Sequence, residues 1–412
     1  MNNVTGSAEN IPTSVQFPVV GIGASAGGLE AIREFVQAIP EKSGMAYVFV
    51  QHLNPEHPSA LAEIVGKLAK IPVKSITDDI DLDTDHFYIV PENKIVTTVD
   101  GKLKLSPLDK ERHTVKVIDL FFSSLAVVHQ SFAVGVVLSG TLNDGTLGLQ
   151  VIKAYGGITF AQDEVSATYT GMPKNAVNSG AVDFIMAPAQ IVQQLLTINN
   201  PFHTDATLAV SESTTNQKDE DIYKQLLTVL RVRKNVDFGY YKSSTLKRRI
   251  MRRMALNNIE KPAEYLIFLR ENRREQDDLY NDMLISVTSF FRDPASFKFL
   301  SDTIIPSILE HKNETDSLRI WVAGCATGEE AYSLAIAVQE NLGEKTADYK
   351  IQIFATDISE IAIAKARTGI YSASDVDGIS AARLQQYFSK IDGSYHVSNP
   401  SGKCVFSRII TF

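Results

Sequence analysis

Apolar, strand-like runs alternate with helix-like segments across residues 17–198, and this alternation constrains the fold more than any other feature of the sequence. The runs are VVGIG, AYVFVQH, HFYIVP, FAVGVVLSG, GGITFAQ and VDFIMAP. Strands that alternate with helices predict an α/β domain with a doubly wound, mainly parallel and buried sheet. Residues 222–310 then have a helical pattern, and another strand–loop–helix unit begins at Leu318.

The composition changes at residues 199–221, where the sequence is rich in Thr, Ser, Asn and Asp and lacks apolar periodicity. Such a stretch is typical of a linker. We therefore expect an α/β domain over 17–198, a linker over 199–221, a small helical domain over 222–310 and a further α/β domain over 318–412. A chain of 412 residues is long enough for each domain to bury a core of its own.

Composition and charge exclude several classes of protein. A formal net charge of −8 argues against nucleic-acid binding by the chain as a whole. The cysteines, Cys325 and Cys404, do not make a disulfide framework. Residues 1–16 lack the pattern of a signal peptide, and no apolar run is long enough to span a bilayer. We therefore expect a cytoplasmic protein that does not insert into membranes.

The sequence VVGIGASAGGLEAI, residues 19–32, is a strand that breaks into small residues and then becomes a helix. Leu29, Ile32 and Phe35 recur at helical spacing, so the helix begins just after Gly28. Ser25 therefore stands where unpaired backbone N–H groups can hold an anion. Two interpretations fit this turn: the loose dinucleotide fingerprint, or a serine nucleophile raised on a strand-to-helix turn.

The following strands favour the nucleophile. A dinucleotide site needs an acidic residue at the end of the next strand, but that strand ends in Gln51 and His52. Histidine is the general base that a serine nucleophile needs. Asp144, in the turn after FAVGVVLSG, is a carboxylate that can orient the imidazole. Each residue alone is explained as a turn or surface residue, but together Ser25, His52 and Asp144 predict a hydrolytic triad.

These residues lie in motifs that resemble the catalytic domain of the bacterial chemotaxis protein-glutamate methylesterases (CheB). The motifs GIGASAGG, VFVQHLNP, VLSGTLNDGTLG and AQDEVSATYTGMPKNAV follow the family's order over residues 17–195. The resemblance implies that Ser25 is the nucleophile, His52 the base and Asp144 the orienting acid. It further implies hydrolysis of glutamyl methyl esters on chemoreceptors, and deamidation of receptor glutamines, with no cofactor and no metal. The family often has other residues at Ala26 and Thr141, and neither departure removes a triad group.

The second half, residues 222–412, resembles the chemotaxis receptor methyltransferases (CheR). The motifs are ISVTSFFRD, RIWVAGCATGEEAYSLAI and IQIFATDISEIAIAKARTGIY. A strand, a tight turn and a helix are followed by a strand that ends in Asp357, where a ribose is bound in Rossmann-like folds. Read alone, Asp357 is a helix N-cap. The resemblance implies S-adenosylmethionine as cofactor, with contacts from Thr288, Arg292, Glu330 and Asp357.

The last cofactor and substrate segment of that family has no match before Phe412. We therefore expect a partial, Rossmann-like methyltransferase domain over 318–412, with weak binding of S-adenosylmethionine or none and no methyl transfer by this chain.

A basic cluster, KRRIMRR, occupies residues 247–253. By resemblance it is a docking surface for acidic receptor helices, which is the interpretation we favour. A solvated helix face is the second interpretation, and nucleic-acid binding the third.

Two other classes of function remain open for the chain: a noncatalytic receptor-docking scaffold, and a dinucleotide-dependent oxidoreductase. A serine-directed fluorophosphonate label separates them from the hydrolase, because only the hydrolase activates Ser25.

Overall fold

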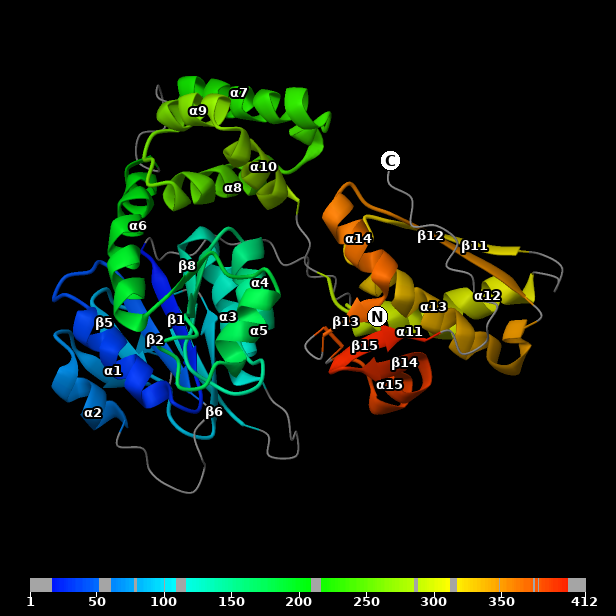
Figure 1. Ribbon diagram of the computed structural model, residues 1–412, viewed down its shortest axis with the longest axis horizontal. Coiled ribbons are helices and arrows are strands. Elements are labelled where there is room, and N and C mark those ends of the chain that lie inside the picture. Colours follow the sequence, from blue (N-terminus) through cyan, green and yellow to red (C-terminus); the bar gives the residue numbers. More distant parts are fainter. Residues whose placement is uncertain are drawn as a thin grey trace, which may run out of the picture. The chain divides into compact units, whose positions relative to one another are not determined.

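The computed structural model describes residues 17–51, 61–77, 80–99, 101–108, 116–208, 216–284, 288–311, 317–347, 349–372, 375–376 and 378–398. The chain divides into two compact units, Met1–Met283 and Leu284–Phe412 (Figure 1). In the first unit, we call the described residues up to 208 the sheet domain and residues 216–283 the helical domain. Among the described residues, no helix is long and apolar enough to cross a membrane.

A parallel sheet forms the centre of the sheet domain. Its order among the described residues is β10-β9-β8-β1-β2-β5-β3, and all neighbouring strands are parallel. The strands are β1 (Val19–Ala24), β2 (Ala46–Gln51), β3 (Val73–Ser75), β5 (His86–Ile89), β8 (Ala133–Val137), β9 (Ile158–Gln162) and β10 (Phe184–Met186). The chain thus builds one side of the sheet outward from β1 and then returns to build the other from β8. This confirms the expected doubly wound sheet, with its topological switch point between β1 and β8.

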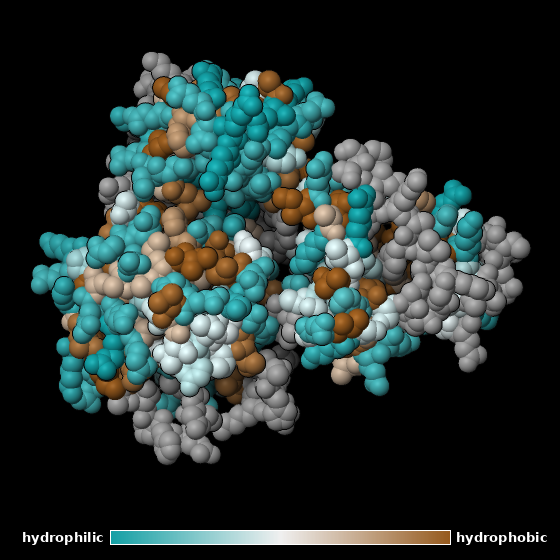
Figure 2. Space-filling view, viewed as in Figure 1, coloured by the Kyte–Doolittle hydropathy of each residue, from teal (hydrophilic) through white to brown (hydrophobic). Residues whose placement is uncertain are grey.

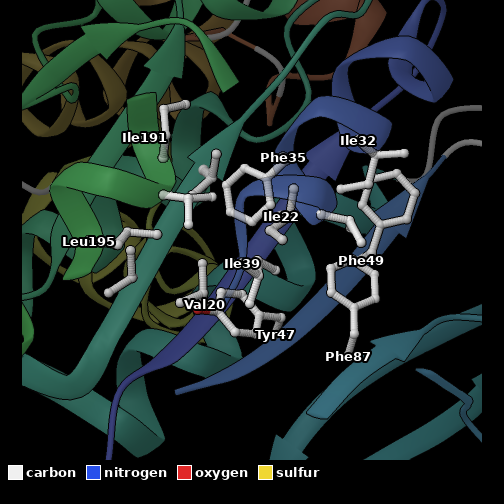
Figure 3. Packing of buried hydrophobic residues seen from close by; sticks show 14 of the residues in the cluster. Val20, Ile22, Ile32, Phe35, Ile39, Tyr47, Phe49, Phe87, Ile191 and Leu195 are labelled. Carbon is white, nitrogen blue, oxygen red and sulfur yellow. The ribbon is translucent and has the colours of Figure 1, made fainter. Parts of the chain in front are cut away.

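Helices cover both faces of the sheet. They are α1 (Gly28–Ala38), α2 (Leu61–Leu68), α3 (Val117–His129), α4 (Thr146–Ala154), α5 (Gly171–Asn178) and α6 (Pro188–Leu208), with a short turn, η1 (Gln130–Phe132). On one face, α1, α2 and α6 share an apolar core with the strands, in which Phe35, Tyr47 and Ile191 are buried (Figure 3). On the other face, α3, α4 and α5 pack with an antiparallel sheet of β4 (Ile80–Asp81), β7 (Lys102–Pro107) and β6 (Lys94–Val99).

Glycines let α3 lie unusually close to the sheet. A Cβ atom on Gly23 of β1 would stand 2.4 Å from Ile118 Cγ2, and one on Gly21 would stand 2.9 Å from Phe121 Cε1. Gly148 of α4 is equally tight, because its Cβ would lie 2.4 Å from Phe122 Cβ. Contacts this short leave no space for a methyl group, so glycine at these positions sets the depth at which α3 sits.

The helical domain consists of α7 (Asn216–Lys234), α8 (Ser243–Leu256), α9 (Pro262–Glu271) and α10 (Arg273–Met283), with a short turn, η2 (Phe238–Tyr240). The structure differs from the predicted linker over 199–221, since α6 continues to Leu208 and α7 begins at Asn216. Each helix is anchored by buried apolar residues outside the polar stretch, such as Leu195 in α6 and Leu226 in α7.

The second unit begins with α11 (Pro294–Phe299), a π-helical turn η3 (Leu300–Ile304) and α12 (Ile305–Glu310). A parallel pair of strands, β11 (Ser317–Ala323) and β12 (Lys350–Thr356), packs on α13 (Glu329–Leu342), which a short turn η4 (Gly343–Ala347) follows. After α14 (Glu360–Thr368) come β13 (Ile370–Tyr371), α15 (Ala381–Tyr387), β14 (Phe388–Ile391) and β15 (Ser394–Val397). Residues 284–310, expected with the helical domain, belong to this second unit.

Replacing Gly23 with alanine tests the close packing of α3. We expect Gly23→Ala to lower the free energy of unfolding by about 1–3 kcal/mol, as overpacking of a core does. Gly66→Ala is the matched control, because nothing lies within 4 Å of a Cβ placed on this α2 residue, and we expect it to be neutral or slightly stabilising. Urea unfolding of the two variants measures the difference, and equal stabilities would contradict the packing argument.

Candidate functional site

Ser25 lies in the turn between β1 and α1, and it is partly exposed. Its backbone N–H donates to Ser139 O at 3.0 Å, while its carbonyl accepts from Gly28 N at 3.0 Å and Gln51 Nε2 at 3.3 Å. The turn also needs the left-handed backbone of Gly27, whose φ is +71°. Ser25 is therefore held from both flanking strand ends, and its side chain stands beside the N-terminus of α1.

The loop after β8 closes against this turn. A Cβ atom on Gly140 would lie 3.1 Å from Ser25 Cβ and 2.1 Å from Met172 Sδ, so glycine lets the loop approach the serine. Ser139 Oγ donates to Ala26 O at 2.9 Å and accepts the Tyr169 N–H at 3.0 Å. Sequence reasoning missed Ser139, whose only signal is its place at the carboxyl end of a buried strand.

Asp144 follows β8 at the same edge, and its carboxylate is buried. One oxygen accepts the N–H of Ile118 at 3.0 Å, and the other accepts those of Asp119 at 2.9 Å and Gly145 at 2.8 Å. Two of these donors belong to the first turn of α3, where the helix dipole favours a negative charge. The backbone therefore holds the Asp144 carboxylate in one orientation.

Asp119 is a second buried carboxyl group beside Asp144. It accepts the N–H of Gly148, in the first turn of α4, at 2.7 Å. Burial, followed by the charge of Asp144, raises the pKa of Asp119 to about 7. Asp119 therefore gains a proton near neutral pH. Sequence reasoning missed it, although its position in the first turn of a buried helix was a signal.

The strand order explains which predicted site residues come together. β1 lies between β2 and β8, and the pairs Ala24–Gln51 and Gly23–Val137 place the three carboxyl ends side by side. Ser25 and the turn that carries Asp144 thus share one edge of the sheet. His52 lies outside the described residues, directly after Gln51, the last residue of β2.

In the second unit, Asp357 follows β12 and faces the turn after β11. Its carboxylate accepts the Ala326 N–H and the Ser359 N–H, both at 2.8 Å. The N-cap of α14 is Ser359, whose side chain accepts the Ala362 N–H. Ser359, and not Asp357, is therefore the N-cap of α14. Asp357 instead joins the end of β12 to the turn that follows β11.

Of the other predicted cofactor contacts, Glu330 lies in α13, and Thr288 and Arg292 lie in the segment before α11. Thr288 and Arg292 flank a pair of buried phenylalanines: the Phe291 N–H donates to Ser333 Oγ on α13 at 2.9 Å, and the ring of Phe290 contacts that of Tyr371 with centroids 4.9 Å apart. The Tyr371 hydroxyl donates to Thr327 O at 2.8 Å, in the turn before α13. Arg292 is exposed, as is Glu330 in the first turn of α13. Among the described residues no group of three or more His, Cys, Asp and Glu side chains could hold a metal ion.

Comparison with known protein families matches most of the chain. CheB methylesterase matches residues 20–195, the all-alpha domain of CheR methyltransferase matches 221–284, and the SAM binding domain of CheR methyltransferase matches 286–408. The chain is a fusion of CheB and CheR family domains.

Individual proteins are similar to the whole chain or to its first half. An "uncharacterized 104.1 kDa protein in hypE 3'region" of Rhodobacter capsulatus is 32% identical over 82% of this chain and 37% of its own length. A protein-glutamate methylesterase/protein-glutamine glutaminase of Salmonella typhimurium is 35% identical over 43% of this chain and 52% of its own length. The solved CheB methylesterase catalytic domain of Thermotoga maritima aligns at 27% identity and a TM-score of 0.42, covering 44% of this chain and 98% of that one. The chain spans about half the length, or less, of the curated relatives named here.

The basic cluster of the CheR-type helical domain does not form the open surface that we expected. Arg249 and Arg252 are only 4% and 2% exposed, and both contact the CheB-type sheet domain. The expectation of a docking surface for acidic helices is therefore wrong for these two arginines, because burial removes them from reach.

Asp119→Asn tests the raised pKa of the buried pair. A carboxyl group whose pKa is higher in the folded than in the unfolded protein makes stability fall as pH rises through the interval between the two values, here from about 4 to about 7. The asparagine variant does not lose stability in this way. The melting temperature of Asp119→Asn, relative to that of the parent protein, should therefore rise between pH 5 and pH 8.

Asp163→Asn is the control, because hydrogen bonds from Ser166 and Val165 outweigh burial and lower the pKa of Asp163. Its effect should be constant between pH 5 and pH 8. Parallel melting curves for Asp119→Asn and the parent protein across that range would contradict the assignment.

Proposed function

We propose that this chain hydrolyses glutamyl methyl esters on a chemoreceptor or a similar signalling protein, with Ser25 as nucleophile, His52 as general base and Asp144 as the orienting acid. The observation that carries the proposal is the meeting of Ser25 and the Asp144 turn at the edge where β2, which precedes His52, also ends. A relative of the sheet domain is named protein-glutamate methylesterase/protein-glutamine glutaminase.

In the first half of the reaction, Ser25 Oγ attacks the ester carbonyl carbon while its proton passes to His52. The negative charge that develops on the carbonyl oxygen is stabilised by backbone N–H groups at the N-terminus of α1. The C–O bond to the methoxy group then breaks, and methanol leaves with the proton from His52. The products of this half are methanol and an acyl-enzyme.

In the second half, water attacks the acyl group, gives one proton to His52 and releases the glutamyl side chain as a carboxylic acid, while the proton on His52 returns to Ser25. With a glutamine substrate the leaving group of the first half is ammonia. Three backbone N–H groups hold the Asp144 carboxylate in place, and in the proposed mechanism the carboxylate orients and stabilises the protonated histidine.

The alternative of a dinucleotide-dependent oxidoreductase has less support. The residue that ends β2 is Gln51, and its amide donates to the Ser25 carbonyl. An amide used in this way supports the serine turn and does not replace the acidic ribose ligand. Fluorophosphonate labelling distinguishes the esterase from a noncatalytic scaffold, because a scaffold would not activate Ser25 for reaction with the label.

We also propose that the second unit binds S-adenosylmethionine at the turn between β11 and α13. Asp357 stands at the end of β12 with both oxygens oriented by backbone N–H groups, and each oxygen keeps a lone pair for a ribose hydroxyl. A Cβ atom on Gly324, whose φ is +71°, would meet nothing within 4 Å, so the turn leaves room for a ligand. When bound, the cofactor supplies the methyl group, and Thr288, Arg292, Glu330 and Asp357 are the residues that we propose hold it.

Variants of the triad test the esterase. Ser25→Ala should abolish the release of methanol from methylated receptor and labelling by a fluorophosphonate, with an unchanged circular dichroism spectrum. Asp144→Asn should keep Ser25 in place but lower kcat by roughly 10⁴-fold, as the loss of the orienting acid does in a serine protease. Ser124→Ala, which removes a hydroxyl from α3, is the control and should keep full labelling. Retained methanol release in Ser25→Ala would overturn the proposal.

Asp357→Asn tests the cofactor site. Isothermal titration with S-adenosylmethionine should give a Kd raised on the order of tenfold or more, because hydrogen bonds to a charged group are lost. Glu360→Gln removes an equal charge from the exposed start of α14 and should leave the Kd unchanged. Equal Kd values for Asp357→Asn and the parent protein, or no binding by the parent at millimolar cofactor, would contradict this site.

A further inference from the structure

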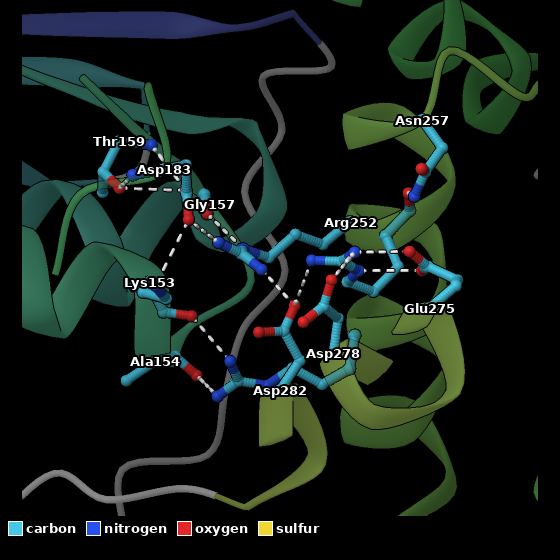
Figure 4. A network of polar contacts seen from close by, with 12 residues as sticks. Lys153, Ala154, Gly157, Thr159, Asp183, Arg252, Asn257, Glu275, Asp278 and Asp282 are labelled. Carbon is cyan, nitrogen blue, oxygen red and sulfur yellow. Dashed lines mark hydrogen bonds and ion pairs between the residues drawn. The ribbon is translucent and has the colours of Figure 1, made fainter. Parts of the chain in front are cut away.

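Helix α8 carries the basic cluster, and it joins the helical domain to the sheet domain (Figure 4). Arg248 donates to the side chain of Gln130, and Arg249 donates to Lys153 O at 2.7 Å and to Ala154 O. Arg252 donates from Nε to Gly157 O at 3.0 Å. Three arginines on one helix are thus used within the chain.

Arg249 completes the end of α4. Lys153 and Ala154 form the last turn of that helix, where carbonyl groups have no partner within the helix and carry the negative end of the dipole. A guanidinium group that donates to both carbonyls satisfies them and places a positive charge where the dipole favours one.

Arg252 makes the strongest contact, because it pairs with an acid from each domain. Its guanidinium forms ion pairs with Asp183 of the sheet domain and Asp282 of α10, and its side chain is 0% exposed against 6% and 11% for the two acids. Burial by itself would raise the pKa of Asp183, but the charges of Arg252 and Lys153 outweigh it and hold the pKa below its usual range. A buried charge with two partners is strongly destabilising if one is removed.

Apolar residues of α8 also pack against the sheet domain, next to the charged contact. Ala255, at the end of α8, is buried in the same core as α1 and α6, and Leu256 packs against it. Gly156 lies close enough that its Cβ would contact the backbone of Arg248, at 3.7 Å from the carbonyl oxygen. The interface therefore has an apolar part and a fully paired charged part.

The contacts lie at the edge of the sheet remote from Ser25. Gln130, Gly157 and Asp183 all precede their strands β8, β9 and β10, whereas Ser25 follows β1. Because these strands are parallel, their amino ends share the opposite edge from the one that carries Ser25.

We propose that α8 is an internal docking element. Arg248, Arg249 and Arg252 bind the amino edge of the sheet, join the two domains into one cooperative unit, and are thereby withheld from acidic polypeptides outside the chain. The contact leaves the carboxyl edge of the sheet, which carries Ser25, open to a substrate. The outer helices α7 and α9 present a largely hydrophilic surface on the face seen in Figure 2, and they remain available to solvent.

Hydrogen exchange on the full chain, followed by mass spectrometry, tests the proposal. Arg252→Met should raise exchange in peptides that cover 153–158 and 245–256 by roughly a hundredfold, because two buried carboxylates lose their partner. Lys247→Met is the matched control on the same helix; Lys247 pairs with Glu220 inside the helical domain, and its loss should leave 153–158 unchanged.

Asp183→Asn gives a second route if Arg252→Met fails to fold. The double variant Asp183→Asn/Arg252→Met should exchange no faster than Arg252→Met alone, since both changes break one contact. Unchanged exchange at 153–158 in both single variants, or additive effects in the double variant, would overturn the proposal.

Binding of poly-L-glutamate gives an independent measurement. The parent protein should bind it weakly, and Arg252→Met should bind it more tightly in a salt-sensitive manner, because Arg248 and Arg249 become exposed. Binding by the parent that Arg249→Met abolishes would show that the helix is already open and would overturn the proposal. None of these measurements depends on esterase activity.

Discussion

The close approach of α3 to the central sheet is the constraint on which the candidate esterase site depends. Because Gly21 and Gly23 of β1 have no side chains, α3 packs directly against the strand that precedes Ser25. The N-terminus of α3 then offers two backbone N–H groups to Asp144, which follows the neighbouring strand. The packing of one core face and the orientation of the Asp144 carboxylate therefore depend on each other, because the same helix supplies both.

The two edges of the parallel sheet have different uses. At the carboxyl edge, the loop after β8 packs on the turn that carries Ser25, through Ser139 and Gly140. Ser25 therefore lies beside the N-terminus of α1. The amino edge carries the end of α4 and the buried acid Asp183, which together match the arginines of α8. The helical domain thus contacts the sheet domain without covering the edge that carries Ser25.

The sequence predicted the parallel sheet well, because the sheet depends on local patterns, and the triad stays a prediction. Apolar runs bounded by glycine turns identify strands, and Ser25 and Asp144 follow such runs directly. It predicted the linker over 199–221 poorly, because composition there is polar while the flanking helices are stabilised by residues outside the stretch. It missed Asp119, whose unusual pKa arises from burial and from a charge 25 residues away in the sequence.

The sequence by itself determined the order of strands and helices, the chemical groups at the strand ends and the families to which the domains belong. Only the tertiary structure decided which charges face solvent. The run KRRIMRR has the same composition whether it is solvated, bound to a partner or buried. Arg249 and Arg252 are buried here because Asp183, Asp282 and the carbonyl groups that end α4 converge on one helix from distant parts of the chain. A helix-spaced pattern of basic residues carries no information about groups that far away.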